Sequence, residues 1–296
     1  MPSVLNHDLH DAVEKDGFVV IRNFLSPEEV KYYLAASETA VQLSRDGKWP
    51  HVRTRGKQFP PWPKNFSPDI WGVSGLLHPD LAEIDPSLGV TFQKLYAHDR
   101  LLDSASDILQ TPRDNLVMEL LNMLINPLTD FELEWHRDDI RPEVTAEEEL
   151  AALKLEDTGT QFNLALCEDS CLVVVPATHK RARTEEEREV TLAPGRNGKI
   201  PGQLVVELKP GDCVFYNNNI LHRGVYNSKV KRVTLHGSYG HGTNGKSRSQ
   251  NVLQHGVSEW LPRFKPTDPK LIQLKAGLDK LVTENKGKDI GYSLDG

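Results

Sequence analysis

Cysteine is scarce in this chain of 296 residues, which contains only Cys167, Cys171 and Cys213. Three unevenly spaced cysteines cannot form the framework of paired disulfides that holds small secreted domains together. All three lie in apolar stretches, where a free cysteine usually behaves as a small buried hydrophobic side chain. We therefore expect packing roles for them, without redox or metal chemistry.

A long hydrophobic run and a surplus of positive charge are also lacking. No apolar stretch approaches the roughly 20 residues that a membrane-spanning helix needs. The first residues show no basic region followed by an apolar stretch, and the last residues are not a Ser-Lys-Leu address. The formal net charge of -7 argues against a general nucleic-acid-binding protein. We expect a cytoplasmic protein with a small-molecule substrate, no nucleic acid and no membrane partner; the oligomeric state is not indicated.

The first third of the chain is predicted to be helices and loops. A short β-branched strand is expected over 16–21. Ser26, Pro27 and Glu29 then form the signature of a capped helix start. The stretch 49–80, rich in proline and tryptophan, predicts an ordered loop region. Helical spacing of leucines resumes over 86–109.

From Val117 onward, short apolar or β-branched runs replace the helical spacing, over 117–125, 160–166, 171–175, 203–208, 212–216 and 230–239. Strands at this density predict a sandwich or barrel-like β-core. The acidic stretch 144–156 interrupts the core and predicts a surface helix. A last helix is expected over 270–281.

These elements predict one domain over 1–296. It would consist of a helical and loop N-terminal part over 1–116, a β-core over 117–241 and a C-terminal helical extension over 242–296.

The pentapeptide Glu-Trp-His-Arg-Asp over 134–138 carries the first chemical signal. On an extended segment His136 and Asp138 project to the same face and can hold one metal ion, whereas Asp139 projects to the other face. With 11 histidines in the chain, a single His-x-Asp pair is expected by chance. A second pair, His78 and Asp80, is interpreted as structural, with Asp80 capping a helical turn.

The downstream sequence raises the first pair above chance. His222 lies in Leu-His-Arg-Gly over 221–224 and supplies a third ligand type. Two histidines and one carboxylate on one face leave open positions and are typical of non-haem iron(II) oxygenases. Arg232 and Thr234 share a strand face, where a guanidinium and a hydroxyl make a fork for a carboxylate.

With these residues in place, the chain resembles the phytanoyl-CoA dioxygenase family of iron(II)- and 2-oxoglutarate-dependent oxygenases, and particularly its fungal members. Matching stretches occur in family order, at 17–20, 121–127, 135–138, 171–180, 211–212, 221–224 and Arg232. The resemblance implies a mainly β fold with flanking helices, a double-stranded β-helix of the jelly-roll or cupin-like barrel type. Ala177 stands where a glycine is usual, and the acidic stretch 144–156 is a further departure.

The resemblance also implies a site with iron(II), 2-oxoglutarate and O2. Its metal ligands would be His136, Asp138 and His222, and Arg232 would hold the distal carboxylate of 2-oxoglutarate. Thr234, Asn122 and Asn163 lie on strands that could line the cosubstrate pocket.

The substrate mouth is expected in irregular segments near the metal. The stretch 53–71 alternates cations with aromatic side chains, a composition suited to a flat or an anionic molecule. The candidate substrate residues are Arg55, Lys57, Trp62 and Arg137. The acidic stretch 144–156 follows Asp138 closely and is a candidate lid.

The expected reaction is the oxidation of a small organic substrate by hydroxylation, desaturation or related C–H oxidation, in secondary metabolism. Asp138 argues against a halogenase, in which a small residue there frees a position for chloride. Two other functions stay open. A cupin-like isomerase or lyase working without O2 would not need a carboxylate anchor such as Arg232. A non-catalytic metal-binding β-sandwich module would not explain the three ligand-type residues and the arginine together.

Overall fold

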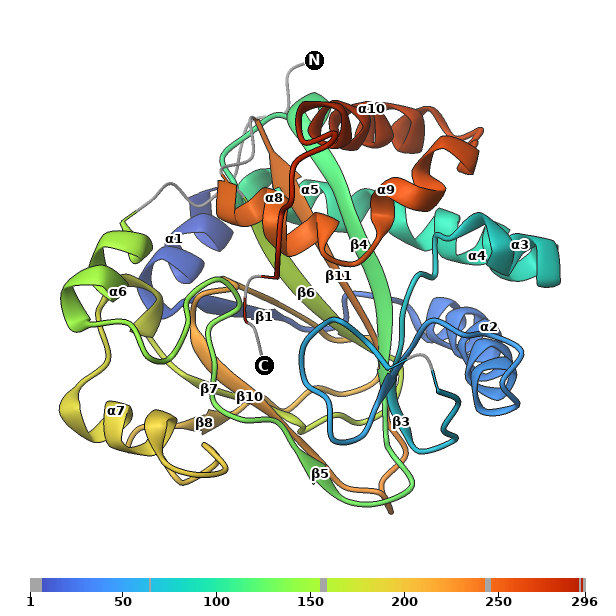
Figure 1. The fold of residues 1–296 in the computed structure, drawn as a ribbon. Coiled ribbons are helices and arrows are strands. Elements are labelled where there is room, and N and C mark those ends of the chain that lie inside the picture. The colour runs from blue at the N-terminus through green and yellow to red at the C-terminus, as the bar shows by residue number, and fades with distance from the viewer. Residues whose placement is uncertain (1–6, 64, 155–158, 243–245, 293, 295–296) are drawn as a thin grey trace.

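The structure is a computed structural model, and it describes residues 7–63, 65–154, 159–242, 246–292 and 294. Two antiparallel sheets form the core, with helices outside them (Figure 1). The strands are β1 (Phe18–Ile21), β2 (Val52–Thr54), β3 (Ile70–Val73), β4 (Leu116–Ile125), β5 (Phe131–Glu132), β6 (Gly159–Ala165), β7 (Leu172–Val175), β8 (Leu204–Val205), β9 (Cys213–Tyr216), β10 (Leu221–Tyr226) and β11 (Val233–His241). The larger sheet has the order β1-β9-β6-β11-β4-β3-β2, and the smaller one β5-β10-β7-β8.

Helices flank these sheets along the whole chain. They are α1 (His7–Asp16), α2 (Pro27–Arg45), α3 (Pro79–Ile84), α4 (Pro86–Tyr96), α5 (Asp99–Ile108), α6 (Ala146–Leu153), α7 (Glu185–Leu192), α8 (Lys246–Leu253), α9 (Val257–Trp260) and α10 (Pro269–Glu284), with 3-10 turns at Arg113–Asn115, Thr178–Lys180 and Leu261–Arg263. The helix α10 packs against β4 through leucines at helical spacing. The predicted mainly β core with flanking helices is therefore present.

Most elements follow the sequence pattern. The capping box of α2 forms as expected, with the Ser26 side chain accepting from Glu29 N and the Glu29 side chain accepting from Ser26 N. The prediction of a loop over 49–80 is wrong in one respect, because β2 and β3 lie within this range and extend the larger sheet. The prolines of this stretch fall outside both strands, so they do not interrupt the ladder. The cap assigned to Asp80 is also wrong: His78 is the N-cap of α3, and its Nδ1 accepts from Asp80 N at 3.2 Å.

The three cysteines are free, with Cys213 buried and the other two partly buried. Burial raises the pKa of Cys213 well above its ordinary value and that of Cys171 to about 11. A thiol with a raised pKa is a poor nucleophile and a poor metal ligand at neutral pH. Their environments agree with the packing roles expected from the sequence.

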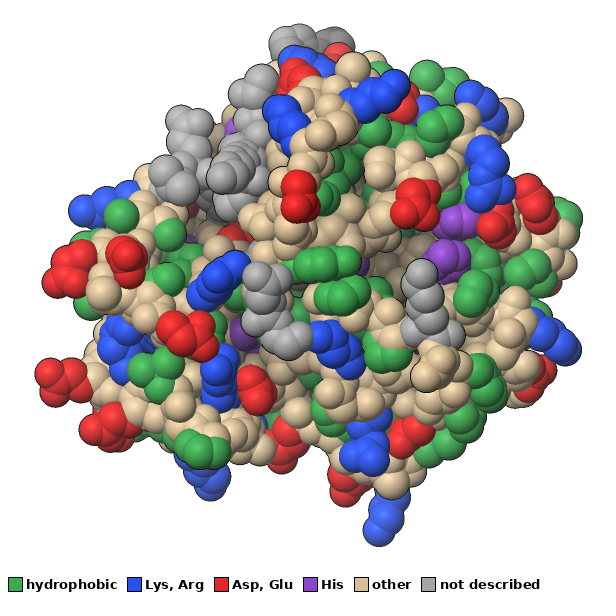
Figure 2. Space-filling model, in the orientation of Figure 1, with side chains coloured by type: hydrophobic (Ala, Val, Ile, Leu, Met, Phe, Trp, Pro, Cys, Tyr) green, Lys and Arg blue, Asp and Glu red, His purple; other side chains and the backbone are tan. Residues whose placement is uncertain are grey.

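The surface carries charges of both signs. Figure 2 shows acidic and basic side chains interspersed on one face, without a large patch of either sign. Pairs such as Lys180 with Glu14 and Lys231 with Glu38 lie on the surface. Among the described residues, no helix is both long enough and apolar enough to cross a lipid bilayer.

The acidic stretch after Asp138 folds as the helix α6, and one of its acids is fully buried. The Glu149 carboxylate accepts from Arg137 Nε at 2.8 Å, Arg183 Nε at 2.9 Å and Arg188 Nη2 at 2.7 Å. Arg137 comes from the loop before α6, Arg183 from the residues just before α7, and Arg188 from α7 itself. One carboxylate therefore fixes α6 to the body of the protein.

Replacing Glu149 with glutamine should destabilise the protein strongly. Arg137 and Arg183 are buried and would lose their carboxylate, and breaking a buried ion pair from one side costs about 3–5 kcal/mol. Urea unfolding should show this loss in the free energy of unfolding. Glu147 lies on the same helix but is exposed, so Glu147→Gln should change stability by less than about 0.5 kcal/mol. Equal effects of the two variants would refute the role assigned to Glu149.

Candidate active site

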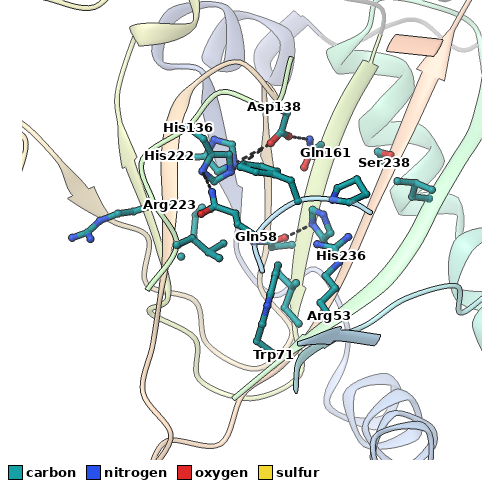
Figure 3. Close-up of a pocket in the computed structure, with 18 of the residues that line it drawn as sticks. Arg53, Gln58, Trp71, His136, Asp138, Gln161, His222, Arg223, His236 and Ser238 are labelled. Carbon is teal, nitrogen blue, oxygen red and sulfur yellow. Dashed lines mark hydrogen bonds and ion pairs between the residues drawn. The ribbon is translucent and has the colours of Figure 1, made fainter. Parts of the chain in front are cut away.

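His136, Asp138 and His222 come together between the two sheets. One ligand-type atom of each lies within 4.8 Å of the others. The Nε2 atoms of His136 and His222 lie 3.5 and 3.8 Å from Asp138 Oδ1, as Figure 3 shows. The geometry agrees with the prediction that alternation along an extended segment brings His136 and Asp138 to one face.

The backbone explains how two distant segments meet here. His136 N donates to His222 O at 3.0 Å, and His222 N donates to His136 O at 3.1 Å. This antiparallel bridge joins the segment after β5 to the strand β10. Asp138 N donates to Asn218 O at 3.0 Å and continues the pairing. The ligand set is thus held by main-chain hydrogen bonds.

Both imidazoles have the same tautomer. His136 Nδ1 lies 2.7 Å from Glu134 O, and His222 Nδ1 lies 2.8 Å from Ile220 O. A carbonyl oxygen can only accept, so each Nδ1 carries the proton and each Nε2 keeps its lone pair. Metal-binding histidines are oriented in this way by hydrogen bonds to the nitrogen that does not bind the metal.

Two glutamines that the sequence did not single out support the ligands. Gln58 Oε1 accepts from Glu134 N at 2.7 Å and its Nε2 donates to Glu134 O at 3.1 Å, so Gln58 fixes the carbonyl that orients His136. Gln161, on β6 of the opposite sheet, donates from its amide to Asp138 Oδ2. The Asp138 carboxylate therefore has one oxygen tied to the larger sheet and the other facing the two imidazoles.

The electrostatics favour a neutral histidine and an ionised aspartate. Burial, together with the charge of His222, lowers the pKa of His136 to about 3. Burial alone would raise the pKa of Asp138, but His222, His136 and the hydrogen bond from Gln161 together hold it below its ordinary value. A neutral imidazole and a carboxylate are the forms that bind a divalent metal ion.

Asp139 takes no part in this cluster. Its carboxylate accepts from the side-chain amides of Asn218 and Asn251, the latter at 2.9 Å. Burial raises its pKa to about 6. Asp139 therefore faces away from the histidines, as the alternation of side chains predicts.

A cavity of about 110 Å³ adjoins the three residues and is lined from both sheets. Arg232 lines it, and its Nε donates to Asp169 at 2.9 Å. The Thr234 hydroxyl donates to the same carboxylate. The fork predicted from Arg232 and Thr234 exists, but it holds a carboxylate of the chain itself. Among the described residues, Arg232 Nη1 has no hydrogen-bond partner, although it is buried.

Arg53 is a second cation of the cavity and was missed as a site residue. Its guanidinium lies 5.2 and 5.3 Å from the ring centres of Trp62 and Trp71. Burial lowers its pKa, and in the described part of the chain no carboxylate lies within ion-pair distance. Gly72 on the neighbouring strand leaves the space, because an added Cβ would lie 3.0 Å from Arg53 Cδ.

The sequence alone does not distinguish which of Arg53 and Arg55 faces the cavity. Strict alternation places both on one face, but a register shift between Arg53 and Thr54 breaks the alternation. Arg55 is exposed, pairs with Asp69 at 3.0 Å and does not line this cavity. Lys57 lines a neighbouring surface pocket and is absent from this cavity.

Of the other expected site residues, some line the cavity and some do not. Trp62 and Asn163 line the cavity, and Asn163 Oδ1 lies 2.9 Å from His236 Nδ1. Asn122 lies outside it, where its Oδ1 accepts from Gly75 N at 3.0 Å. Arg137 is buried in the Glu149 cluster, which corrects its assignment to the substrate.

The lid expected over 144–156 is not supported by the described residues. None of them up to Lys154 lines the cavity. The cover comes instead from the C-terminal part of the chain, where Asn251, Gln254 and His255 line the cavity. Residues 155–156 lie outside the described part of the chain.

Acid should destabilise the protein through His255. Burial lowers the pKa of His255 to about 3 from an ordinary value of 6.5. Between these values the unfolded chain binds a proton that the native protein does not, so stability falls as the pH decreases. Urea titrations at several pH values should show this loss, and His255→Asn should reduce proton uptake on unfolding by about one proton. Identical pH slopes would contradict the assignment.

The fold is similar to those of several solved structures, some of which contain 2-oxoglutarate. EctD from S. alaskensis, with 2-oxoglutarate and 5-hydroxyectoine, is 18% identical over 81% of this chain and 77% of that chain, with a TM-score of 0.55. HygX from Streptomyces hygroscopicus, with nickel and 2-oxoglutarate, is 15% identical over 81% of this chain and 89% of that chain, with a TM-score of 0.55. The epimerase SnoN from nogalamycin biosynthesis is 19% identical over 79% of this chain and 82% of that chain, with a TM-score of 0.51. At identities this low, the structural similarity shows a shared fold and nothing more.

At the level of sequence, no curated protein matches the chain. The profile of the phytanoyl-CoA dioxygenase family matches residues 13–231. This match spans well over half of the chain and includes His136, Asp138 and His222, and it confirms the resemblance read from the motifs. The chain belongs to the phytanoyl-CoA dioxygenase family.

Proposed function

We propose that the protein is an iron(II)- and 2-oxoglutarate-dependent oxygenase that oxidises a small organic substrate. One observation carries the proposal: two imidazole Nε2 lone pairs and one carboxylate oxygen converge on one side of a cavity that also holds buried guanidinium groups. The two antiparallel sheets on either side of this cavity support a double-stranded β-helix, carried by a single domain.

The three residues fit a divalent iron ion. His136 and His222 offer their Nε2 atoms as nitrogen ligands, and Asp138 offers an anionic oxygen. Because all three come from one side, the opposite side of a bound ion would stay open for other ligands. Gln58 fixes the Glu134 carbonyl that orients His136, and Gln161 holds Asp138 in the orientation that the ion needs.

The cavity also fits the 2-oxoglutarate dianion. Arg232 Nη1 is buried and has a free donor direction, which a carboxylate of the cosubstrate would satisfy. The Asp169 carboxylate keeps the Arg232 guanidinium in a fixed orientation and its pKa above the ordinary value. Arg53 adds a second positive charge to the same cavity.

When bound, iron(II) and 2-oxoglutarate supply an O2-dependent oxidation in which 2-oxoglutarate is decarboxylated to succinate. The protein's own residues bind these groups, orient the substrate and exclude water. Hydroxylation, desaturation and related C–H oxidation are all compatible with this machinery, and a role in secondary metabolism fits it as well. SnoN is an epimerase, and SnoK, another solved structure of similar fold from nogalamycin biosynthesis, is a carbocyclase. Proteins of similar fold therefore catalyse different reactions.

Anaerobic addition of Fe(II) and 2-oxoglutarate should produce the weak visible charge-transfer band of this cosubstrate chelated to iron(II). His136→Ala, His222→Ala and Asp138→Ala should each abolish the band and 2-oxoglutarate turnover, because each removes a metal ligand. Asp139→Asn should retain both, since its carboxylate faces Asn218 and Asn251. A band that survives in a triad variant, or is lost only in Asp139→Asn, would overturn the ligand assignment.

Replacing Arg232 with alanine should weaken 2-oxoglutarate binding. A charge-assisted contact in a desolvated pocket contributes on the order of 2–4 kcal/mol, or roughly 30- to 1000-fold in affinity. Arg232→Lys should rescue only part of this loss, because an ammonium cannot form the planar fork. The affinity is measured by titration of the charge-transfer band.

Arg55→Ala is the matched control, since Arg55 is an exposed arginine paired with Asp69. It should leave the affinity unchanged. Thermal unfolding of Arg232→Ala should be measured in parallel, because the buried Asp169 loses its partner. Unchanged 2-oxoglutarate affinity in a folded Arg232→Ala would transfer the anchoring role to Arg53.

A further inference from the structure

A second cavity of about 510 Å³ lies beside the cavity at the three ligands. The two share a wall formed by Pro60, Trp62, Leu120, Gln254 and His255. We call the cavity at the ligands the inner cavity and its neighbour the outer cavity. Since the outer cavity is several times larger, most of any sizeable molecule reaching the ligands would have to lie there.

Two stacked rings form the centre of the shared wall. The rings of Trp62 and His255 are inclined by 25° with centres 6.4 Å apart, and Trp62 also meets the ring of Trp71 edge-on at 6.1 Å. Trp62 belongs to the proline-rich segment between β2 and β3, and His255 follows α8. His255 lies beyond residue 231, where the family match ends.

Aromatic and imidazole rings also line the outer cavity. The His51 and His78 rings are 4.7 Å apart, and Trp260 lies 5.4 Å from His78. Burial lowers the pKa of His51 and brings that of His78 to about 4, so both rings are neutral at physiological pH. Pro50, Pro60, Pro61 and Pro63 complete a rigid, mostly uncharged lining. Figure 2 shows histidine side chains beside a hollow on this face.

The charges of the inner cavity are already balanced once its cofactors are bound. Arg232 lines the cavity and pairs with Asp169, which lies outside the lining, and Arg53 matches Asp138 in charge. Iron(II) and the 2-oxoglutarate dianion together add no net charge. The Arg223 side chain points away from the three ligands (Figure 3), and it pairs with Glu132 at 2.8 Å. A charged prime substrate would thus bring an unpaired charge into a desolvated site, which is costly.

The wall contains one unsatisfied donor. Trp62 Nε1 is buried and has no hydrogen-bond partner among the described residues. A buried indole N–H usually finds an acceptor, because leaving it unpaired costs about 1–3 kcal/mol. A ligand lying against the wall can supply that acceptor.

We infer that the outer cavity binds the body of the prime substrate, a neutral, flat and mainly apolar molecule with a carbonyl- or ether-type acceptor. Trp62 and His255 are its specificity-determining residues, and they direct one end of the molecule toward His136, Asp138 and His222. The alternative left open by the sequence, a flat or an anionic molecule, is decided in favour of the flat neutral one. This inference rests on the proposed function.

The test uses two fluorescent probes on the folded full-length protein. Prodan is a neutral, flat ketone, and anilinonaphthalene sulfonate is an anion of similar size. Prodan should bind the wild type more tightly than the sulfonate. Trp62→Ala and His255→Leu should each weaken prodan binding on the order of tenfold, because each removes a stacking surface. Trp62→Phe keeps a ring but loses the N–H, and should weaken it about fivefold.

Phe66→Ala provides the matched control. Phe66 is an exposed aromatic residue of the same segment and lines neither cavity, so prodan affinity should not change. Prodan affinity that is unaffected by Trp62→Ala overturns the inference. The inference is also overturned if the sulfonate binds more tightly than prodan and loses this affinity in Arg53→Ala. The site would then prefer an anionic ligand.

The charge-transfer band of the wild type separates this inference from the proposed function. If the band is present and Trp62→Ala does not change the affinity for prodan, the oxygenase proposal stands and the outer cavity is not the substrate site. If the band is absent and prodan depends on Trp62 and His255, the proposed function fails, and with it the claim that the bound molecule is the substrate.

Discussion

The pair of hydrogen bonds between the main chains of His136 and His222 organises this molecule. It brings the segment after β5 and the strand β10 into register, so that two imidazoles separated by a large part of the sequence face one carboxylate. Backbone pairing fixes the direction of each side chain, and the Nδ1 contacts to Glu134 O and Ile220 O then fix each ring. Side-chain chemistry follows from strand register here, because a slip of one residue in either segment would turn its imidazole away from the other one.

Around this centre, the protein distinguishes guanidinium groups that support structure from those that face the cavity. Arg137 and Arg183 share Glu149, and Arg232 is held by Asp169. In each case a buried carboxylate offsets the desolvation of the cation. Arg53 lies against two indole rings with no such carboxylate among the described residues. Its positive charge therefore remains available to whatever occupies the cavity.

The sequence was sufficient for those residues whose roles depend on local spacing. His136 and Asp138 are two residues apart on an extended segment, and alternation alone distinguishes Asp138 from Asp139. His222 and Arg232 followed from family order along the chain. In the same way, capping chemistry predicted the start of α2, and the density of β-branched runs predicted the strands of the core.

Roles that depend on contacts between distant segments could not be predicted. Nothing local to Asp169 indicates that it pairs with Arg232, which lies 63 residues away in the sequence. The register shift after Arg53 is equally invisible, and it exchanges the roles of Arg53 and Arg55. His255 had no motif of its own, since its role exists only where the turn after α8 meets the proline-rich segment.

The buried Glu149 determines which parts of the protein unfold locally together. Two of its partners, Arg183 and Arg188, lie 34 and 39 residues later in the chain, the first just before α7 and the second within it. The helix α6 alone would expose this carboxylate, and the arginines alone would face one another. Neither helix can detach without leaving the other's charges unpaired, so α6 and α7 form one cooperative unit of local unfolding. Amide protons of the two helices should accordingly share a single exchange behaviour, although they belong to separate parts of the sequence.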